Sequence, residues 1–291
     1  MSQKNFDYNT AFSRNIGWIT HEEQATLKNK RIAIAGLGGV GGSHLITLTR
    51  LGIGKFNVAD FDKFELPNFN RQAGASVSHI DRQKTDVMTE MALDINPELD
   101  IKTFNNGVTK ENLSEFFTDV DLYVDSLDFF AFEAREMVFA YCAEHGIPAI
   151  TAAPLGMGTA LLNFLPGQMT FEEYFQLKDK SENDKILHFL LGLSPAMLQR
   201  SYLVDQSAVD LLNHKGPSTP MACALCAGFA ATQALKILLK RGKVFAAPWG
   251  LHFDAYNDKL AKTWRPGGNS NLIQKIGIFV ARKQLMAKLK K

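Results

Sequence analysis

A glycine-rich turn joins an apolar run to an amphipathic run near the start of the chain, and it restricts the fold more than any other segment. Residues 32–35 are all apolar and predict a short buried strand, and residues 43–51 predict a helix. Between them lie five glycines, and four of these make the turn: Gly36, Gly38, Gly39 and Gly41. Bare backbone N–H groups and the positive end of a helix suit an anion at such a turn. The pattern predicts a nucleotide held by its phosphates; a tight strand-to-helix turn without a ligand is the alternative.

The turn by itself does not distinguish NAD, FAD and ATP, because loops of this kind bind all three. The next predicted strand, residues 56–60, ends in Asp60, and an acid at the tip of the second strand suits a ribose hydroxyl. Asp62 follows two residues later and is a second candidate for binding the nucleotide. Capping of the following turn is its alternative role.

Two amides and two cations follow the acid of the second strand: Asn68, Gln72, Arg71 and Lys84. An NAD enzyme needs little positive charge beyond its pyrophosphate site. A triphosphate that is being cleaved does need it, because negative charge moves onto the leaving group. The cations therefore favour ATP. Taken alone, residues 81–86 around Lys84 are typical of a charged helix face.

Asp128 comes shortly after another predicted strand, residues 122–124. This places it at the carboxyl edge of the sheet, where open α/β sheets bind their ligands. A carboxylate at that edge can hold magnesium while waters complete the metal's shell. Capping of a helix that starts near Phe130 is the alternative role.

Together these residues resemble the ThiF/MoeB/HesA superfamily, the ubiquitin-activating-like adenylyltransferases, in both order and spacing. The resemblance covers about residues 10–165 and, more loosely, residues 216–256. It implies that Arg71 and Lys84 contact phosphates and that Asp128 organises the metal. It also implies that the amides of Asn68 and Gln72 support the same pocket.

Enzymes of this superfamily carry an arginine near the amino terminus that reaches into the ATP site of the partner subunit. Arg14 matches that position, so the resemblance implies a homodimer in which Arg14 acts across the two-fold axis. A solvated charge on a polar amino-terminal stretch is the alternative.

The resemblance also implies an activity. A carboxylate attacks the α-phosphorus of ATP, pyrophosphate leaves, and an acyl-adenylate forms, with ATP and Mg²⁺ as cofactors. The acid is expected to be the C-terminal glycine of a small ubiquitin-like or sulfur-carrier protein, or else a peptide or small metabolite. Two alternatives stay open: an NAD- or FAD-dependent oxidoreductase, which the glycine turn permits, and a non-catalytic nucleotide-binding scaffold.

The three cysteines separate this chain from many members of that superfamily, which hold a structural zinc with two Cys-x-x-Cys pairs. Here only Cys223 and Cys226 have that spacing, so we expect no zinc site. Thioester-forming relatives carry a nucleophilic cysteine in the crossover segment, but residues 166–219 hold none. We expect no catalytic cysteine and interpret all three, Cys142 included, as small buried apolar residues. A redox or acyl-carrying role for the Cys223–Cys226 pair is the open alternative.

Alternating strand and helix patterns predict an α/β fold with a Rossmann-like, mostly parallel sheet flanked by helices. Five parts are expected: an N-terminal helical segment (1–30), a nucleotide-binding adenylation domain (31–165), a helical insertion (166–215), a return to the main domain (216–260) and a C-terminal basic helical tail (261–291). Core packing is the expected role of the insertion, with a substrate groove or a dimer face as alternatives. The tail is expected to pack on the domain or on a partner, with a membrane-surface helix as the alternative.

Composition agrees with a soluble enzyme. The formal net charge of the 291 residues is +2, so no nucleic-acid partner is expected. No apolar run looks long enough to span a membrane, so no membrane partner is expected either. The amino terminus lacks the apolar stretch of a signal peptide, and three cysteines do not make a disulfide framework. We therefore expect a cytoplasmic protein.

Overall fold

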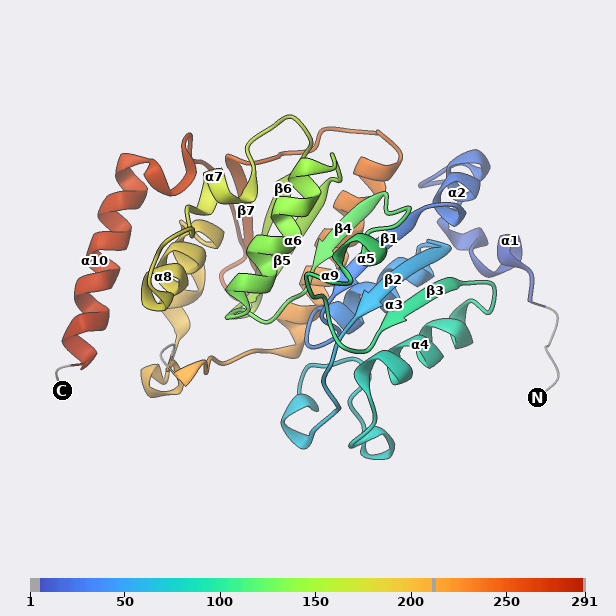
Figure 1. Ribbon diagram of the computed structural model, residues 1–291, viewed down its shortest axis with the longest axis horizontal. Helices are drawn as coiled ribbons and strands as arrows, with labels where there is room; N and C mark the ends of the chain where they lie inside the picture. The colour runs from blue at the N-terminus through green and yellow to red at the C-terminus, as the bar shows by residue number, and fades with distance from the viewer. Residues whose placement is uncertain (1–5, 211–212, 290–291) are drawn as a thin grey trace.

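One eight-stranded sheet forms the centre of the molecule, in the order β3-β2-β1-β4-β5-β6-β7-β8 (Figure 1). The computed structural model describes residues 6–210 and 213–289, with side chains described up to residue 283. Pairing is parallel from β3 to β5 and antiparallel from β5 to β8. The α/β prediction is therefore confirmed. The strands are β1 (Arg31–Ala35), β2 (Lys55–Ala59), β3 (Asp100–Phe104), β4 (Leu122–Asp125), β5 (Ala149–Leu155), β6 (Gly158–Phe164), β7 (Trp249–Asp254) and β8 (Lys259–Trp264).

Helices cover both faces of the sheet (Figure 1). Helices α3, α4 and α9 pack on one face, and α5, α6, α7 and α8 pack on the other. The helices are α1 (Tyr8–Ala11), α2 (His21–Lys28), α3 (Gly41–Arg50), α4 (Lys84–Ile95), α5 (Leu113–Phe116), α6 (Phe132–Glu144), α7 (Phe171–Phe175), α8 (Glu182–Leu193), α9 (Pro220–Leu238) and α10 (Leu272–Leu289).

Strand β1 is apolar throughout because both of its faces are covered. Ile32 and Ile34 pack on the side of α3 and α9, while Ala33 and Ala35 face the side of α6. Strands β2, β4 and β5 run in the same direction as β1. The loops that follow these four strands therefore meet at one edge of the sheet, beside the amino end of α3.

Helix α9 corrects the expectation that no apolar run reaches membrane-spanning length. Its 19 residues are apolar enough by composition to cross a membrane. Its contacts with β5, β6 and α3 place it in the core of this domain instead. A buried core helix and a membrane span share the same length and composition, so here the packing decides between them.

The insertion packs on α6 through stacked and tilted aromatic rings. Phe171 of α7 lies 4.3 Å from Phe139 of α6, measured between ring centroids, and Phe175 lies 5.0 Å from Phe189 of α8. Helix α10 then packs on α8 and is the outermost element at that end of the molecule (Figure 1).

Strand β8 crosses the boundary expected at residues 260/261, because it pairs with β7 as a hairpin before α10 begins. It is an edge strand that carries two lysines, Lys259 and Lys262, and such residues hide the alternation that marks a strand.

Candidate active site

Close backbone contacts shape the glycine turn between β1 and α3. Gly36 has φ +88°, and a Cβ placed on it would lie 2.3 Å from the carbonyl oxygen of Ser126. A Cβ on Gly41 would lie 1.8 Å from the carbonyl oxygen of Gly36. No side chain can be accommodated at such distances, so the fold itself requires glycine at these two positions.

Gly38 and Gly39 are under less constraint from the fold, and neither has a positive φ. A Cβ on Gly38 would meet only the side-chain amide of Gln72, 3.7 Å from Nε2. A Cβ on Gly39 would lie 3.3 Å from Cys223 Sγ and 3.5 Å from Arg71 Nε. The missing side chain of Gly38 leaves the backbone open, as expected where a ligand approaches it closely.

The amino end of α3 is suited to an anion. Val40 precedes the helix and no side chain caps it; in the first turn the backbone N–H of Gly42 donates to the carbonyl oxygen of Gly38 at 3.4 Å. Two buried polar atoms beside the turn, Gln72 Oε1 and Ser126 Oγ, have no hydrogen-bond partner among the described residues. Buried polar atoms nearly always have one, so both fit a polar ligand in the turn.

Asp60 directly follows β2, and its carboxylate binds the glycine turn. Oδ2 accepts a hydrogen bond from Leu37 N at 2.6 Å, and Oδ1 accepts one from Asp62 N at 2.8 Å. The residue is 8% exposed. Burial raises the pKa of its carboxyl, and the hydrogen bond from Leu37 opposes that rise. Asp60 thus positions the turn, and its ribose contact stays a prediction.

Lys84 begins α4 but does not belong to a solvated charged face. Its side chain is 6% exposed, and Nζ donates to Asp62 Oδ2 at 2.9 Å. A buried ammonium needs an anionic or polar partner, and Asp62 is that partner here. Since Asp62 also donates its backbone N–H to Asp60, Lys84 is connected to the glycine turn through two carboxylates.

Arg71 lies over the glycine turn, as its distance from a Cβ on Gly39 shows. Its Nη1 donates to the carbonyl oxygen of Pro67 at 3.1 Å and to Asn70 Oδ1 at 3.0 Å. These bonds hold a half-buried guanidinium beside the backbone of the glycine turn.

Asn68 makes hydrogen bonds within its own segment, residues 65–72, which lies beside the glycine turn. Its Oδ1 accepts from Glu65 N at 3.0 Å, and its carbonyl oxygen accepts from the backbone N–H groups of Arg71 and Gln72. In this structure Asn68 shapes the segment that presents Arg71 and Gln72.

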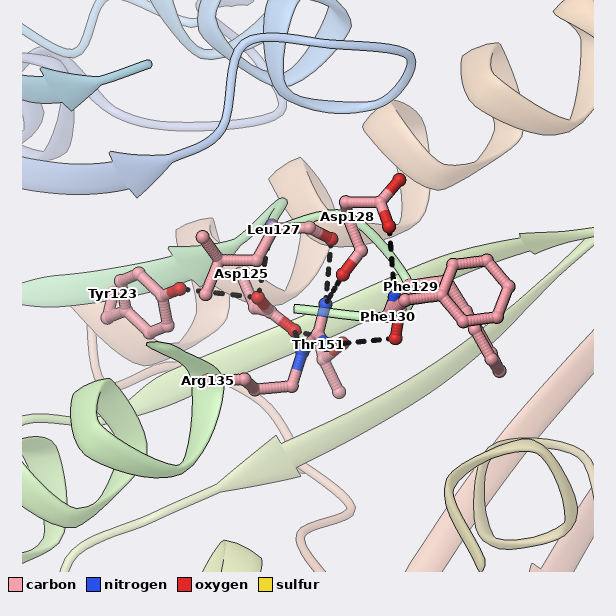
Figure 2. A network of polar contacts seen from close by, with 8 residues as sticks. All are labelled: Tyr123, Asp125, Leu127, Asp128, Phe129, Phe130, Arg135 and Thr151. Carbon is pink, nitrogen blue, oxygen red and sulfur yellow. Dashed lines mark hydrogen bonds and ion pairs between the residues drawn. The ribbon is translucent and has the colours of Figure 1, made fainter. Parts of the chain in front are cut away.

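Asp128 lies in the loop after β4, close to Phe130 (Figure 2). Its Oδ1 accepts from Phe130 N at 3.0 Å. This bond closes a local turn rather than a helix cap, because α6 begins only at Phe132. The residue is exposed. An exposed carboxylate fits Mg²⁺, which binds oxygen ligands and keeps several waters.

The sequence analysis missed the buried ion pair that holds this loop (Figure 2). Arg135 Nε donates to Asp125 Oδ2 at 3.0 Å, and the two side chains are 3% and 2% exposed. The same guanidinium donates to three loop carbonyl oxygens, those of Leu127 at 2.7 Å, Asp128 at 3.0 Å and Phe129 at 3.3 Å. Arg135 therefore sets the path of the loop that carries Asp128.

Asp125 is held from the other side by two hydroxyl groups. Thr151 Oγ1 donates at 2.9 Å and the Tyr123 hydroxyl at 3.2 Å. A signal for the pair was present in the sequence, because Asp125 ends an apolar strand and Arg135 lies within a largely apolar helix. A charged side chain on a buried face is strongly destabilising without a partner of opposite charge, so two such side chains are expected to pair.

Arg14 is not part of this group within its own chain. It is exposed, in a short 3-10 helix, Ser13–Asn15. The next residue, Asn15, donates to the carbonyl oxygen of Leu51 at 3.2 Å, just past the carboxyl end of α3. The ten residues of α3 span about 15 Å, so the segment that carries Arg14 lies at the opposite end of this helix from the glycine turn.

All three cysteines are buried, as expected. Cys223 faces Gly39, and Cys226 Sγ donates to Thr159 Oγ1 at 3.1 Å. Burial raises the pKa of each thiol in this pair, so neither is a ready nucleophile. In the part of the chain that the structure describes, no three His, Cys, Asp or Glu side chains are grouped as metal ligands.

Comparison with known proteins assigns the chain to a family. The model of the ThiF family matches residues 12–271, which include the glycine turn and every site residue described above. The chain belongs to the ThiF family. The resemblance inferred from the motifs is thereby confirmed.

Three relatives show the breadth of the family. The tRNA threonylcarbamoyladenosine dehydratase of Bacillus subtilis is 34% identical over 142 residues, covering 48% of this chain and 55% of the relative. The sulfur carrier protein ThiS adenylyltransferase of Escherichia coli is 30% identical over 148 residues, covering 51% and 58%. Ubiquitin-like modifier-activating enzyme 5 of Drosophila willistoni is 35% identical over 254 residues, covering 81% and 55%. The chain thus spans about half the length of these relatives.

Solved structures show the same fold. E. coli MccB with ATP superposes with a TM-score of 0.65 at 20% identity, covering 90% of this chain and 71% of that chain. PaaA superposes with a TM-score of 0.67 at 17% identity, covering 91% and 77%.

Proposed function

We propose that this protein is an ATP-dependent adenylyltransferase that activates a carboxylate as an acyl-adenylate. The observation that carries the proposal is the position of the Arg71 guanidinium beside the open backbone of the glycine turn. A cation there meets the charge that develops on the phosphates during cleavage. Membership in the ThiF family, which includes a sulfur carrier protein adenylyltransferase, favours this activity over an oxidoreductase.

The residues of the site then have distinct tasks. The N–H groups of the turn and of α3 bind phosphate oxygens, and Arg71 and Lys84 offset negative charge on the departing pyrophosphate. The substrate carboxylate forms the new bond to the α-phosphorus as the bond to the pyrophosphate oxygen breaks, so the protein needs no nucleophile of its own. Asp128 would hold Mg²⁺, which supplies further charge neutralisation when it is bound.

The acid that is activated is a C-terminal carboxylate in this proposal. We propose the C-terminal carboxylate of a small ubiquitin-like or sulfur-carrier protein, or of a peptide. The names of the ThiS adenylyltransferase and of the modifier-activating enzyme among the relatives support this class. Because residues 166–219 contain no cysteine, the acyl group would pass to an external sulfur or amine, in the cytoplasm.

ATP–pyrophosphate exchange tests the activity directly. The purified chain is incubated with ATP, Mg²⁺, labelled pyrophosphate and one candidate acid at a time, including a carrier protein that ends in Gly-Gly. Label should enter ATP only with the correct acid. If no acid supports exchange in a protein that still binds ATP, the result would favour a non-catalytic scaffold. A co-purified nicotinamide or flavin would favour the oxidoreductase.

We also propose a homodimer in which Arg14 completes the site of the partner subunit. The exposure of Arg14 and its separation from its own glycine turn support this arrangement. Arg14→Ala and Arg71→Ala proteins should each be inactive alone. Random mixing should restore about a quarter of wild-type exchange, because half of the dimers then contain one intact site of two. If mixing restores nothing, Arg14 does not act in trans.

A further inference from the structure

Most of the apolar side chains that the structure describes in helix α10 lie on its outside, the reverse of an ordinary surface helix. At about 100° per residue, its exposed apolar residues fall within an arc of about 120°. We call this arc the outer face of α10. Its members, with their exposed fractions, are Leu272 (72%), Ile273 (65%), Ile276 (57%), Phe279 (55%) and Val280 (47%).

The opposite side of α10 is fixed to α8 and prevents the outer face from turning inward. Gln274 and Ile278 are 6% and 5% exposed. Gln274 Nε2 donates to the carbonyl oxygen of Leu191 at 2.5 Å, and Arg282 pairs with Asp184 at 2.8 Å. Rotating the helix would break both contacts and bury the charge of Arg282. The outer face is therefore held outward by the fold.

All charged side chains of the C-terminal segment, residues 272–291, are positive. Residues 272–291 contain five lysines and one arginine and no Asp or Glu. Since the whole chain has a net charge of +2, the rest of the molecule is net negative. Lys283 is exposed within the arc of the outer face and Lys275 is exposed beside it, and Lys283 Nζ lies 4.6 Å from the centroid of the Phe279 ring. Cationic and apolar groups are thus presented together.

We propose that the outer face of α10 binds the surface of an anionic lipid bilayer, with its apolar side chains at the headgroup–acyl boundary and its lysines at the anionic headgroups. Pairing with a second copy would bring the like charges of two α10 helices together. The helix is also the outermost element at its end of the molecule (Figure 1), so a flat surface can contact it along its length. This differs from the composition-based expectation, which could not show that the apolar face of the tail points outward.

Vesicle sedimentation with the full chain tests the proposal at low ionic strength. Vesicles of phosphatidylglycerol and phosphatidylcholine should bind the protein, and vesicles of phosphatidylcholine alone should bind it weakly. Ile276→Gln with Phe279→Gln should weaken binding to the anionic vesicles roughly tenfold or more. The matched control, Val77→Gln with Val204→Gln, removes two side chains that are 80% and 100% exposed elsewhere, and its binding should match that of the wild type. Circular dichroism checks that both double variants are folded.

The contribution of charge is tested separately by Lys275→Gln with Lys283→Gln, which should weaken binding to anionic vesicles only, as added salt should. The proposal is overturned if the wild type fails to bind anionic vesicles, or if the Ile276/Phe279 and Val77/Val204 variants bind equally well. It is also overturned if the outer-face variant abolishes a dimer seen by sedimentation velocity while vesicles stay unbound, which would assign the face to a second copy. If the outer face instead binds an acidic protein, the chain should not bind vesicles.

Discussion

The parallel half of the sheet and the end of the molecule formed by β6–β8, α8 and α10 depart from the usual distribution of residues in opposite ways. Around β1, β2 and β4, charged side chains are buried: Lys84, which pairs with the exposed Asp62, and both partners of the pair Arg135–Asp125. At the other end, apolar side chains are exposed, including Trp264 at 54% and the outer face of α10. Both arrangements cost stability compared with the reverse. We interpret each arrangement as a place where the fold serves binding, as proposed above for the glycine turn and for the outer face of α10.

The largest effect should follow from removing charge at the nucleotide site. Arg71→Ala and Asp128→Ala should each lower ATP–pyrophosphate exchange by roughly 10²–10³-fold, because each group acts on charge that develops during the reaction. Lys259→Ala, on the exposed edge strand, is the control and should leave exchange unchanged. Wild-type exchange in either site variant would refute the assignment of that residue.

A second large effect should appear in stability. Arg135→Leu leaves the Asp125 carboxylate buried without its cation, and it should lower the free energy of unfolding by about 3–5 kcal/mol. Arg241→Ala, which breaks the more exposed pair with Glu23, should cost no more than about 1 kcal/mol. Urea unfolding followed by circular dichroism measures both. Equal losses in the two variants would mean that burial does not set the strength of these pairs.

His44 in α3 should make stability depend on pH. Burial lowers the pKa of this histidine from 6.5 to about 4, and neither ring nitrogen has a hydrogen-bond partner among the described residues. Between these two pKa values the unfolded chain binds a proton that the folded chain does not, so stability falls as the pH falls from about 6.5 to about 4. The full loss is on the order of 3 kcal/mol. His44→Met should remove this part of the pH dependence. The free energy of unfolding is measured against pH for the wild type and the variant, and profiles of the same shape would contradict the prediction.

The smallest effect should come from the outer face of α10. Ile273→Ser removes an apolar side chain that is 65% exposed, and the free energy of unfolding should change by no more than about 0.5 kcal/mol. Ile34→Ala, in the middle of the parallel half, should cost about 2–5 kcal/mol because Ile34 is fully buried. Thermal unfolding of both variants gives the comparison, and a loss above about 1 kcal/mol for Ile273→Ser would show that the outer face already stabilises the monomer.

Most residues of the candidate nucleotide site could be grouped from the sequence because their signals are local. The glycine turn, the acid that ends β2 and the cations that follow it lie close together in the sequence, and the rule that parallel strands end at one edge brings their loops together. The packing partner of Arg135 could not be predicted from spacing, since Asp125 lies on a different element. Lys84 was equally ambiguous until its burial against Asp62 was known.

The sequence alone determined the alternation of strands and helices, the glycine turn and the family, because these depend on short-range geometry and on residue types at fixed spacings. Only the tertiary structure decided that α9 is a core helix, that Asp60 positions the turn through Leu37, and that the apolar side of α10 faces outward. These outcomes depend on which surfaces far apart in the chain cover one another. A periodic pattern shows that a helix has an apolar face, but the direction of that face is set by the rest of the fold.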